Sequence, residues 1–389
     1  MAKPFWLLLI GLALPGLTLA ADRPPSIAAA SVPPGATAAP IALLADLSSG
    51  QVLFARAANQ RVLPASMTKA MTALIAFDLI AAGQLREDAI MTVRPETAQR
   101  WAGRGTTLGL RGGEKVSVRD LLMGTATVSA NDGAVALAEG ALGSLDAWTA
   151  AMNARAATLG MRGSHFASAH GFPDHGRTYV TANDLIRLAA ALINEHPVLY
   201  HRYFGHQSMV WRGVTLRSHD PFAGLLPGAD GIKTGHSFEA GFTFLGSASR
   251  HDRRLVLVIG RVATEPGRAK AAKALAEWGF QAWDSHAFLT PQLVVGTARV
   301  QDGTARSVTL GVPRAFALSL PKGSAAQVSG RIIYDGPLHA PFGKGQQVAR
   351  LEIQIAGQPV HTLPLVTLQA VERAGPIDRI VNGLLGLSA

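Results

Sequence analysis

A serine and a lysine stand three positions apart, at Ser66 and Lys69, in a segment whose apolar residues recur with helical spacing. On a helix this spacing puts both side chains on one face, within reach of each other. A serine hydroxyl beside a neutral amine is an activated nucleophile, because the amine can accept the hydroxyl proton. The pair therefore indicates nucleophilic catalysis by Ser66 with Lys69 as its base.

The same spacing recurs at Ser319 and Lys322, although a chain of this length shows only about one such pair by chance. The second pair encloses Pro321 and lies in sequence patterned as strands, where no helix brings the two side chains together. We therefore assign the chemistry to the first pair and treat the second as a coincidence.

Two triplets follow the first pair along the chain. Ser129-Ala-Asn131 falls between two alanine-rich helical segments, and Lys233-Thr-Gly235 opens a region of strand patterning. Each piece alone could be an ordinary helix cap or strand entry. Together, S-x-x-K, S-x-N and K-T-G in this order are typical of penicillin-interacting serine enzymes.

Composition excludes several other chemistries. The 389-residue chain has no cysteine, which rules out a disulfide framework, a cysteine-ligated zinc and a thiol nucleophile. The formal net charge is +10, but aromatic residues make up only 6% and no run of Lys or Arg exceeds two, so we predict no nucleic-acid partner.

Three histidines, His165, His170 and His175, recur every five residues beside Asp174 and raise the question of a metal site. Five is neither a helical nor a strand spacing, and the segment is rich in turn residues, so we predict loop histidines and no metal. The glycine-rich residues 103–113 lack the phosphate-binding pattern and are expected to form a mobile loop near the cleft. No cofactor is predicted.

The N-terminal residues indicate export. Residues 1–20 contain Lys3, an apolar run and small residues before a cleavage position, which is typical of a secretory signal peptide. The alternative is a membrane anchor, but about ten apolar residues are half of the roughly 20 needed to span a bilayer. Residues 21–40, rich in Pro and Ala, are expected to be a flexible lead-in.

The elements that must position the motifs follow from apolar periodicity, with strands first, then helices, then strands and a helix again. This order predicts an α/β sandwich over residues 41–286. The strands expected are 41–45, 51–55, 241–246 and 255–259, and the helical segments are a helix from Ser66 to Gly83, a block over 117–194 and a helix over 269–283.

Residues 287–373 change to short alternating apolar runs and predict a small all-β domain. The expected strands are 293–295, 316–320, 332–334, 351–355 and 363–368. Residues 374–389 return to helical spacing with one apolar stripe, too short to cross a bilayer but able to lie in its interface. The alternative is a helix packed on its own domain.

The motifs, with Pro64-Ala65 before the serine, Asn131-Asp132, His170-Gly171 and residues 230–236, resemble the D-alanyl-D-alanine carboxypeptidase family of low-molecular-mass penicillin-binding proteins. Residues 338–341 and 364–366 are similar to the second domain of a subgroup that ends in a membrane-associating helix. The resemblance implies a penicillin-binding, serine β-lactamase-like α+β domain whose antiparallel sheet is flanked by helices. It also implies a periplasmic enzyme, peripheral on the inner membrane, that trims D-alanine from peptidoglycan stem pentapeptides and is acylated by β-lactams.

The resemblance further implies a catalytic role for Ser66, Lys69 and Ser129. Ser66 would attack the penultimate D-alanine carbonyl, Lys69 would take its proton if its pKa is lowered, and Ser129 would pass a proton to the leaving amine. The backbone N–H groups of Ser66 and His236 would form an oxyanion hole. The substrate-binding residues implied are Asn131, Lys233, Thr234, Gly235, His236 and Arg268, with Lys233, Thr234 and Arg268 on the terminal carboxylate.

Three other functions share parts of this pattern. A β-lactamase needs a deacylating base, but no E-x-x-L-N occurs between Asn131 and Lys233. A D,D-endopeptidase would cut peptidoglycan cross-links with the same residues. A wall-binding or shape-determining protein with a disused site is the third alternative, although such a site has no physical reason to keep six suitable polar groups.

Overall fold

The computed structural model describes residues 35, 38–251, 253–323, 328–355 and 360–375 of the chain. The chain divides into two compact units between Gln281 and Ala282. Each unit is described by itself. The predicted signal peptide, most of the predicted lead-in and most of the predicted tail helix lie outside the described residues, whereas Ala39 at the end of the lead-in is fully buried.

The larger unit is built on one antiparallel sheet of five strands in the order β2-β1-β9-β8-β7. The strands are β1 (Ile41–Asp46), β2 (Gln51–Arg56), β7 (Ala229–Ser237), β8 (Gly241–Arg250) and β9 (Arg253–Val262). All the strands predicted for this unit are confirmed, and the strand region expected to open at Lys233-Thr-Gly235 is β7. Because β7 is the sheet's edge strand, its outer backbone groups are not paired with another strand of this sheet.

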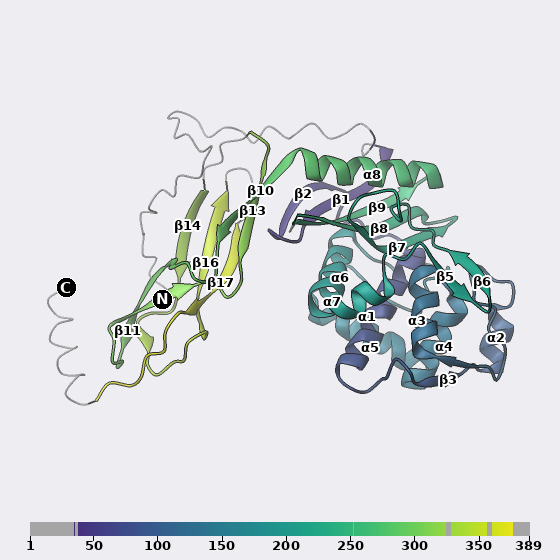
Figure 1. Ribbon diagram of the computed structural model, residues 1–389, viewed down its shortest axis with the longest axis horizontal. Helices are drawn as coiled ribbons and strands as arrows, with labels where there is room; N and C mark the ends of the chain where they lie inside the picture. Colours follow the sequence, from purple (N-terminus) through teal and green to yellow (C-terminus); the bar gives the residue numbers. More distant parts are fainter. Residues whose placement is uncertain (1–34, 36–37, 252, 324–327, 356–359, 376–389) are drawn as a thin grey trace. The chain divides into compact units, whose positions relative to one another are not determined.

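Helices cover both faces of this sheet, with α8 on one side and the other helices of the unit on the opposite side (Figure 1). The larger helices are α1 (Thr68–Ala81), α3 (Val118–Thr127), α4 (Asn131–Leu142), α5 (Leu145–Thr158), α6 (Ala182–Glu195) and α8 (Glu265–Gln281). The short elements are α2 (Pro95–Trp101), α7 (Pro197–Tyr203), β3 (Ile90–Thr92), β4 (Lys115–Ser117), β5 (Ser208–Trp211) and β6 (Val214–Arg217). The predicted α+β fold is confirmed.

Helix α1 is the centre of the helical layer. Every residue from Thr68 to Phe77 is buried, as expected for a helix that is apolar on all sides. Helices α3, α5 and α6 begin at side-chain caps, in which Ser117, Ser144 and Thr181 each accept a hydrogen bond from a backbone N–H three residues later. These local signals explain why the helical block could be predicted from the sequence.

Some predicted boundaries differ. The helix expected over 269–283 begins earlier, at Glu265, and ends at Gln281, because Trp283 begins strand β10. The predicted domain boundary after residue 286 falls inside β10 (Trp283–Leu289), which pairs along its length with β13 (Phe316–Pro321) of the smaller unit. Strand pairing therefore moves the boundary to residue 281.

The smaller unit is all-β in its described residues. A six-stranded sheet has the order β14-β16-β17-β12-β11-β15, and β10 and β13 form a separate pair. The strands of the sheet are β11 (Gly296–Gln301), β12 (Ser307–Gly311), β14 (Val328–Ile333), β15 (Leu338–His339), β16 (Gln347–Ile355) and β17 (His361–Thr367). The predicted strand at 293–295 is wrong, since these residues form a turn and the entry to β11.

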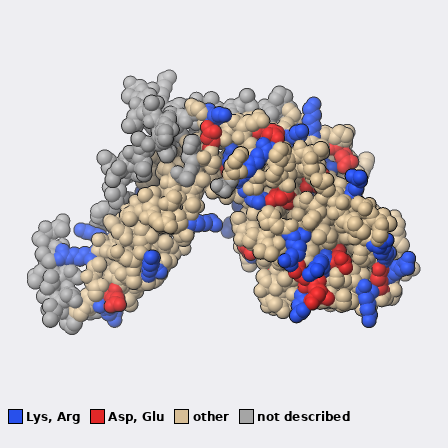
Figure 2. Space-filling view, in the orientation of Figure 1, with Lys and Arg blue, Asp and Glu red and all other residues tan. Residues whose placement is uncertain are grey.

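The second Ser-x-x-Lys pair lies in this unit as predicted, with Ser319 buried in β13. A strand gives Ser319 and Lys322 no shared helical face, so the pair is not a nucleophile with its base. No helix among the described residues is long and apolar enough to cross a membrane. On the face in Figure 2, Lys and Arg are interspersed with Asp and Glu over the larger unit.

Candidate active site

The nucleophile predicted from the sequence sits in a short turn before α1. Residues Ala65–Met67 form a 3-10 turn capped by Pro64, and α1 begins at Thr68. Ala65 has a positive φ of 48°, an uncommon conformation for a residue with a side chain. The turn leaves Ser66 half-buried at the positive end of the α1 dipole, where a developing negative charge is stabilised.

Lys69 lies in the first turn of α1 and is 1% exposed. Its Nζ is 2.8 Å from Ser66 Oγ, 2.7 Å from Asn131 Oδ1 and 2.8 Å from the carbonyl oxygen of His170. Asn131 Oδ1 and the His170 carbonyl oxygen can only accept hydrogen bonds, so they accept from the two N–H groups of a neutral Lys69 amine. The remaining lone pair then faces the Ser66 hydroxyl, which is the arrangement needed to remove its proton.

The electrostatics of the site favour this neutral amine. Burial lowers the pKa of Lys69 well below its usual value, and the nearby positive charge of Lys233 lowers it further. The carboxylate of Asp132 opposes the shift. The condition placed on Lys69 by the sequence argument, a lowered pKa, is therefore met by the structure.

Ser129 and Asn131 are held between the end of α3 and the start of α4. Ser129 is buried and has a φ of 69°, so the chain reverses sharply at this residue. The backbone N–H of Asn131 donates to the carbonyl oxygen of Thr106 at 2.8 Å, which joins the segment to the glycine-rich loop. This backbone geometry lets the Asn131 side chain reach Lys69 while Ser129 lines the same cavity.

Asp132 fixes that loop. Its buried carboxylate accepts hydrogen bonds from the backbone N–H groups of Leu108 at 2.9 Å, Leu110 at 3.0 Å and Gly133 at 2.8 Å. Charge-assisted bonds of this kind are stronger than neutral ones. The part of the loop that was predicted to be mobile is therefore tied to α4 around Leu108 and Leu110.

The third motif lies on the edge strand β7. Lys233 and Thr234 are buried, and Lys233 Nζ is 3.2 Å from the carbonyl oxygen of Thr234. A Cβ at Gly235 would lie 2.5 Å from the carbonyl oxygen of Pro64, so only glycine lets β7 approach the nucleophile's turn this closely. The motif glycine thus sets the distance between the strand and Ser66.

Two cations lie at one end of the site. Burial lowers the pKa of Lys233 to about 7, with Asp220 opposing the shift and Arg268 adding to it. Arg268, in the first turn of α8, is 2% exposed and donates to Glu265 at 2.8 Å and to the carbonyl oxygen of His219 at 3.3 Å. Its Nε has no hydrogen-bond partner among the described residues, which leaves a buried donor for an anion.

These segments enclose a cavity of about 570 Å³. Every predicted site residue except the two lysines lines it, and the lysines are buried. The predicted residues that line the cavity are Ser66, Ser129, Asn131, Thr234, Gly235, His236 and Arg268. A nucleophile, its amine and a pair of cations around one cavity are suited to attack on a carbonyl of a ligand that carries a carboxylate.

Comparison with known proteins supports this assignment. The family described as D-alanyl-D-alanine carboxypeptidase matches residues 27–263, and the C-terminal domain of penicillin-binding protein 5 matches residues 284–373. The D-alanyl-D-alanine carboxypeptidase DacD of Salmonella typhimurium is 33% identical over 93% of each chain. The chain belongs to the D-alanyl-D-alanine carboxypeptidase family. It is a serine-type D-Ala-D-Ala carboxypeptidase, a hydrolase of the penicillin-binding protein class.

Solved structures agree with this family. Penicillin-binding protein 5 of Haemophilus influenzae matches with a TM-score of 0.77 and 28% identity, covering 86% of this chain and 98% of that protein. Ampicillin-bound penicillin-binding protein D2 of Listeria monocytogenes matches with a TM-score of 0.56 and 29% identity, covering 63% of this chain and 98% of that one. Both comparisons support the α+β fold that carries the site of this carboxypeptidase.

The three regularly spaced histidines differ in how deeply they are buried. His165 and His175 are exposed and outside helices and strands, as predicted. His170 is instead buried against Trp101, with ring centroids 4.5 Å apart, so it supports the wall of the cavity from behind. Burial lowers the pKa of His170 to about 3, and its Nδ1 accepts a hydrogen bond from the N–H of Phe172, so the ring is neutral.

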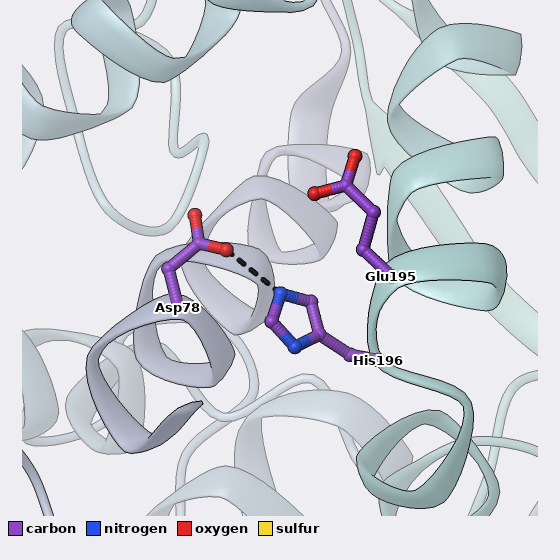
Figure 3. A group of neighbouring side chains, drawn as sticks. All are labelled: Asp78, Glu195 and His196. Atoms are coloured by element: carbon purple, nitrogen blue, oxygen red, sulfur yellow. Dashed lines mark hydrogen bonds and ion pairs between the residues drawn. The ribbon is translucent and has the colours of Figure 1, made fainter. Parts of the chain in front are cut away.

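Among the described residues, the ligand atoms of Asp78, Glu195 and His196 lie close enough to one another to hold a cation (Figure 3). His196 Nε2 is 2.7 Å from Asp78 Oδ1, and Arg155 forms ion pairs with both carboxylates. Both acids are thus already paired with a cationic side chain of the protein. We assign the group to an ion-pair network that joins α5 to α1 and to the end of α6.

Sequence reasoning did not identify several residues around the cavity. Thr106 and Phe172 belong to loops, and Phe238 and Glu239 to the turn after β7. The position of the last two, just beyond the K-T-G motif, was the only signal that could have indicated them. Thr106 lies in the glycine-rich residues 103–113 and Phe172 follows His170-Gly171, so each stands in or beside a segment that the sequence had already indicated.

Proposed function

We propose that Ser66 is the nucleophile of the D-alanine-releasing reaction and that neutral Lys69 is its base. The observation that carries this proposal is the set of three contacts of Lys69 Nζ, which orient its lone pair toward Ser66 Oγ. As Oγ attacks the carbonyl carbon of the penultimate D-alanine, its proton passes to Lys69. The backbone N–H groups of Ser66 and His236 stabilise the oxyanion.

Collapse of the tetrahedral intermediate breaks the peptide bond. Lys69, now protonated, returns the proton through the Ser129 hydroxyl to the amine of the leaving D-alanine, so the charge of the site is restored. An ester between Ser66 and the shortened stem peptide remains. Water then attacks this ester, with Lys69 taking the water's proton and returning it to Ser66 Oγ as the ester breaks.

Substrate binding is assigned to the cationic end of the cavity. Lys233, Thr234 and Arg268 hold the terminal carboxylate, and the buried Nε of Arg268 gives it one donor that no described residue uses. Asn131 binds the substrate amide while it orients Lys69. Gly235 lets β7, the strand beside which the peptide binds, stay against the nucleophile's turn.

The test is D-alanine release from a stem pentapeptide by the purified protein beside its Ser66→Ala variant. We expect release by the parent only, and covalent labelling of the parent only by a fluorescent penicillin. Labelling of the parent without release would instead favour the endopeptidase alternative, to be checked on cross-linked dimers. Release by Ser66→Ala at the parent's rate would refute Ser66 as the nucleophile.

We further propose that the protein is exported after cleavage near residue 20 and is peripheral on the outer face of the inner membrane. The support is the signal pattern of residues 1–20 and the apolar stripe of residues 374–389. N-terminal sequencing of the protein from cells tests the cleavage. Flotation with anionic lipid vesicles, with and without residues 374–389, tests the membrane association, and equal flotation of both forms would contradict it.

A further inference from the structure

The hairpin formed by β5 and β6 ends in a two-residue turn at Arg212 and Gly213. Trp211 pairs with Val214 across the hairpin, and Arg212 and Gly213 have φ values of 47° and 77°. Positive φ at both residues is the mark of a type I′ turn, in which asparagine is the favoured first residue. Arginine therefore suits the backbone less well than asparagine would here, and the contacts of its side chain are the compensation.

Trp211 and Arg212 both hold the glycine-rich loop. Trp211 Nε1 donates to the carbonyl oxygen of Leu108 at 2.9 Å. Arg212 Nη1 donates to the next carbonyl oxygen, that of Gly109, at 3.0 Å. Arg212 also forms an ion pair with Glu114, the residue after the loop. Because two consecutive carbonyl groups are bound, the hairpin fixes the loop backbone at one point.

Leu108 is also held by two helices at this point. Its backbone N–H donates to the buried carboxylate of Asp132 in α4 at 2.9 Å. Its side chain is buried against α3, where a Cβ at Gly124 would lie 2.6 Å from Leu108 Cδ1. The Trp211 contact therefore completes a set in which the N–H, the carbonyl and the side chain of one loop residue are each held by a different element.

This fixed point lies two residues from the part of the loop that meets the catalytic groups. Gly105 and Thr106 line the cavity, and the N–H of Asn131 donates to the carbonyl oxygen of Thr106 at 2.8 Å. Asn131 Oδ1 in turn accepts from Lys69 Nζ at 2.7 Å. A continuous path of contacts thus leads from the hairpin through Leu108 and Thr106 to the residue that orients Lys69.

We propose that Trp211 and Arg212 are positioning residues for acylation, which act by fixing the loop against which Asn131 is set. Neither side chain belongs to the lining of the cavity, so both act through the loop. A misplacement of about 1 Å at a reacting group can cost roughly 100-fold in rate, so even a partial loosening of the loop is measurable. The inference rests on the proposed function, in which Asn131 orients Lys69 as the base.

The deciding variant is Arg212→Asn. Asparagine suits the turn better than arginine but is too short to make the arginine's contacts, so a merely structural role predicts an equal or higher Tm and unchanged chemistry. We expect instead that the rate constant of acylation by a fluorescent penicillin falls about five- to tenfold, with a Tm within about 3 °C of the parent. Trp211→Phe keeps an aromatic ring and loses the N–H donor, and it should lower the rate constant about fivefold.

Arg217→Gln is the matched control, because it removes an exposed cation from β6 whose side chain forms no hydrogen bond or ion pair with a described residue. Its rate constant should equal that of the parent. Loss of folded protein lowers the fraction that is labelled and leaves the rate constant unchanged, so the two effects are separable. Hydrogen exchange of residues 103–113 reports on the loop itself, and it should be faster in Trp211→Phe and Arg212→Asn only.

Each outcome decides one step of the inference. Faster exchange of the loop with the parent's acylation rate would mean that the site does not depend on the loop, and would overturn the positioning role. Slower acylation with unchanged exchange, or equal slowing in Arg217→Gln, would overturn the route through the loop. A parent that is not acylated would refute the proposed function, whereas an acylated parent with unaffected variants would overturn only the role of the hairpin.

Discussion

Gly171 provides the sharpest test of how the fold holds its nucleophile. It has a φ of 74°, and a Cβ added to it would lie 1.9 Å from the carbonyl oxygen of Ala65 and 2.5 Å from Thr68 Oγ1. The first contact is with the turn that carries Ser66, and the second is with the first residue of α1. The Gly171→Ala substitution therefore tests whether this close approach sets the position of the nucleophile.

The expected size of the effect follows from these distances. Cβ contacts under 3.0 Å essentially never occur, so the 1.9 Å contact requires the Ala65 peptide or residue 171 to move by about 1 Å. A misplacement of about 1 Å at a reacting group can cost roughly 100-fold in rate. The left-handed φ adds about 1–2 kcal/mol of destabilisation for alanine.

Gly176→Ala is the matched control. Gly176 lies in the same segment with a φ of 78°, is exposed and has nothing within 4 Å of the added Cβ. It therefore carries the backbone cost without the collision. At roughly 2–4 °C per kcal/mol for a unit of this size, we expect its Tm to fall by about 2–8 °C while its acylation rate stays within twofold of the parent.

The assay is the second-order rate of acylation by a fluorescent penicillin, measured on variants that still unfold cooperatively. We expect Gly171→Ala to lose about 100-fold while Gly176→Ala retains the parent's rate. Acylation of Gly171→Ala within threefold of the parent, at a similar Tm, would refute the reasoning. It would mean that the turn can move away without displacing Ser66.

Three other predictions concern charge in the site. With increasing pH, kcat/KM should first rise as Lys69, whose pKa is lowered, becomes neutral. It should then fall near pH 7, because Lys233 has a pKa of about 7 and loses the charge that is proposed to bind the carboxylate. Asp132→Asn removes a charge that raises the pKa of Lys69, so the rising limb of the pH profile should move to lower pH. The substitution also loses at least one backbone hydrogen bond, which should lower the free energy of chemical unfolding by about 1–3 kcal/mol. An unmoved limb would contradict the electrostatic role of Asp132. Arg268→Gln should raise KM about tenfold or more for a peptide with a free carboxylate, with less effect on kcat, and an unchanged KM would remove Arg268 from the carboxylate site.

Local sequence determined much of the fold. The helix that carries Ser66 and Lys69 follows from apolar spacing, and the pair shares one face because residues three apart on a helix always do. Serine and threonine caps mark helix starts, and alternating residues mark most strands. The strand predicted at 293–295 failed because three apolar residues in a row do not distinguish a strand from the approach to one.

The sequence also supplied the motif residues and their order, but not their electrostatic state. The pKa of Lys69 is lowered because segments far away in the chain bury it and bring Lys233 near. His170 was predicted to be a loop histidine, and only the tertiary structure shows that packing against Trp101 buries its ring. Burial depends on long-range packing, which no local pattern contains.

Tertiary structure alone decided which residues share the cavity. Arg268 reaches it from a helix on the far face of the sheet from α1, and Glu239 reaches it from a turn with no motif. The sequence by itself predicted the nucleophile, its base and the chemical class of the reaction, because these predictions depend on residue types at fixed local spacing. The distances that make the lysine a base, and the side chains available to select a substrate, arise only when the chain closes around them.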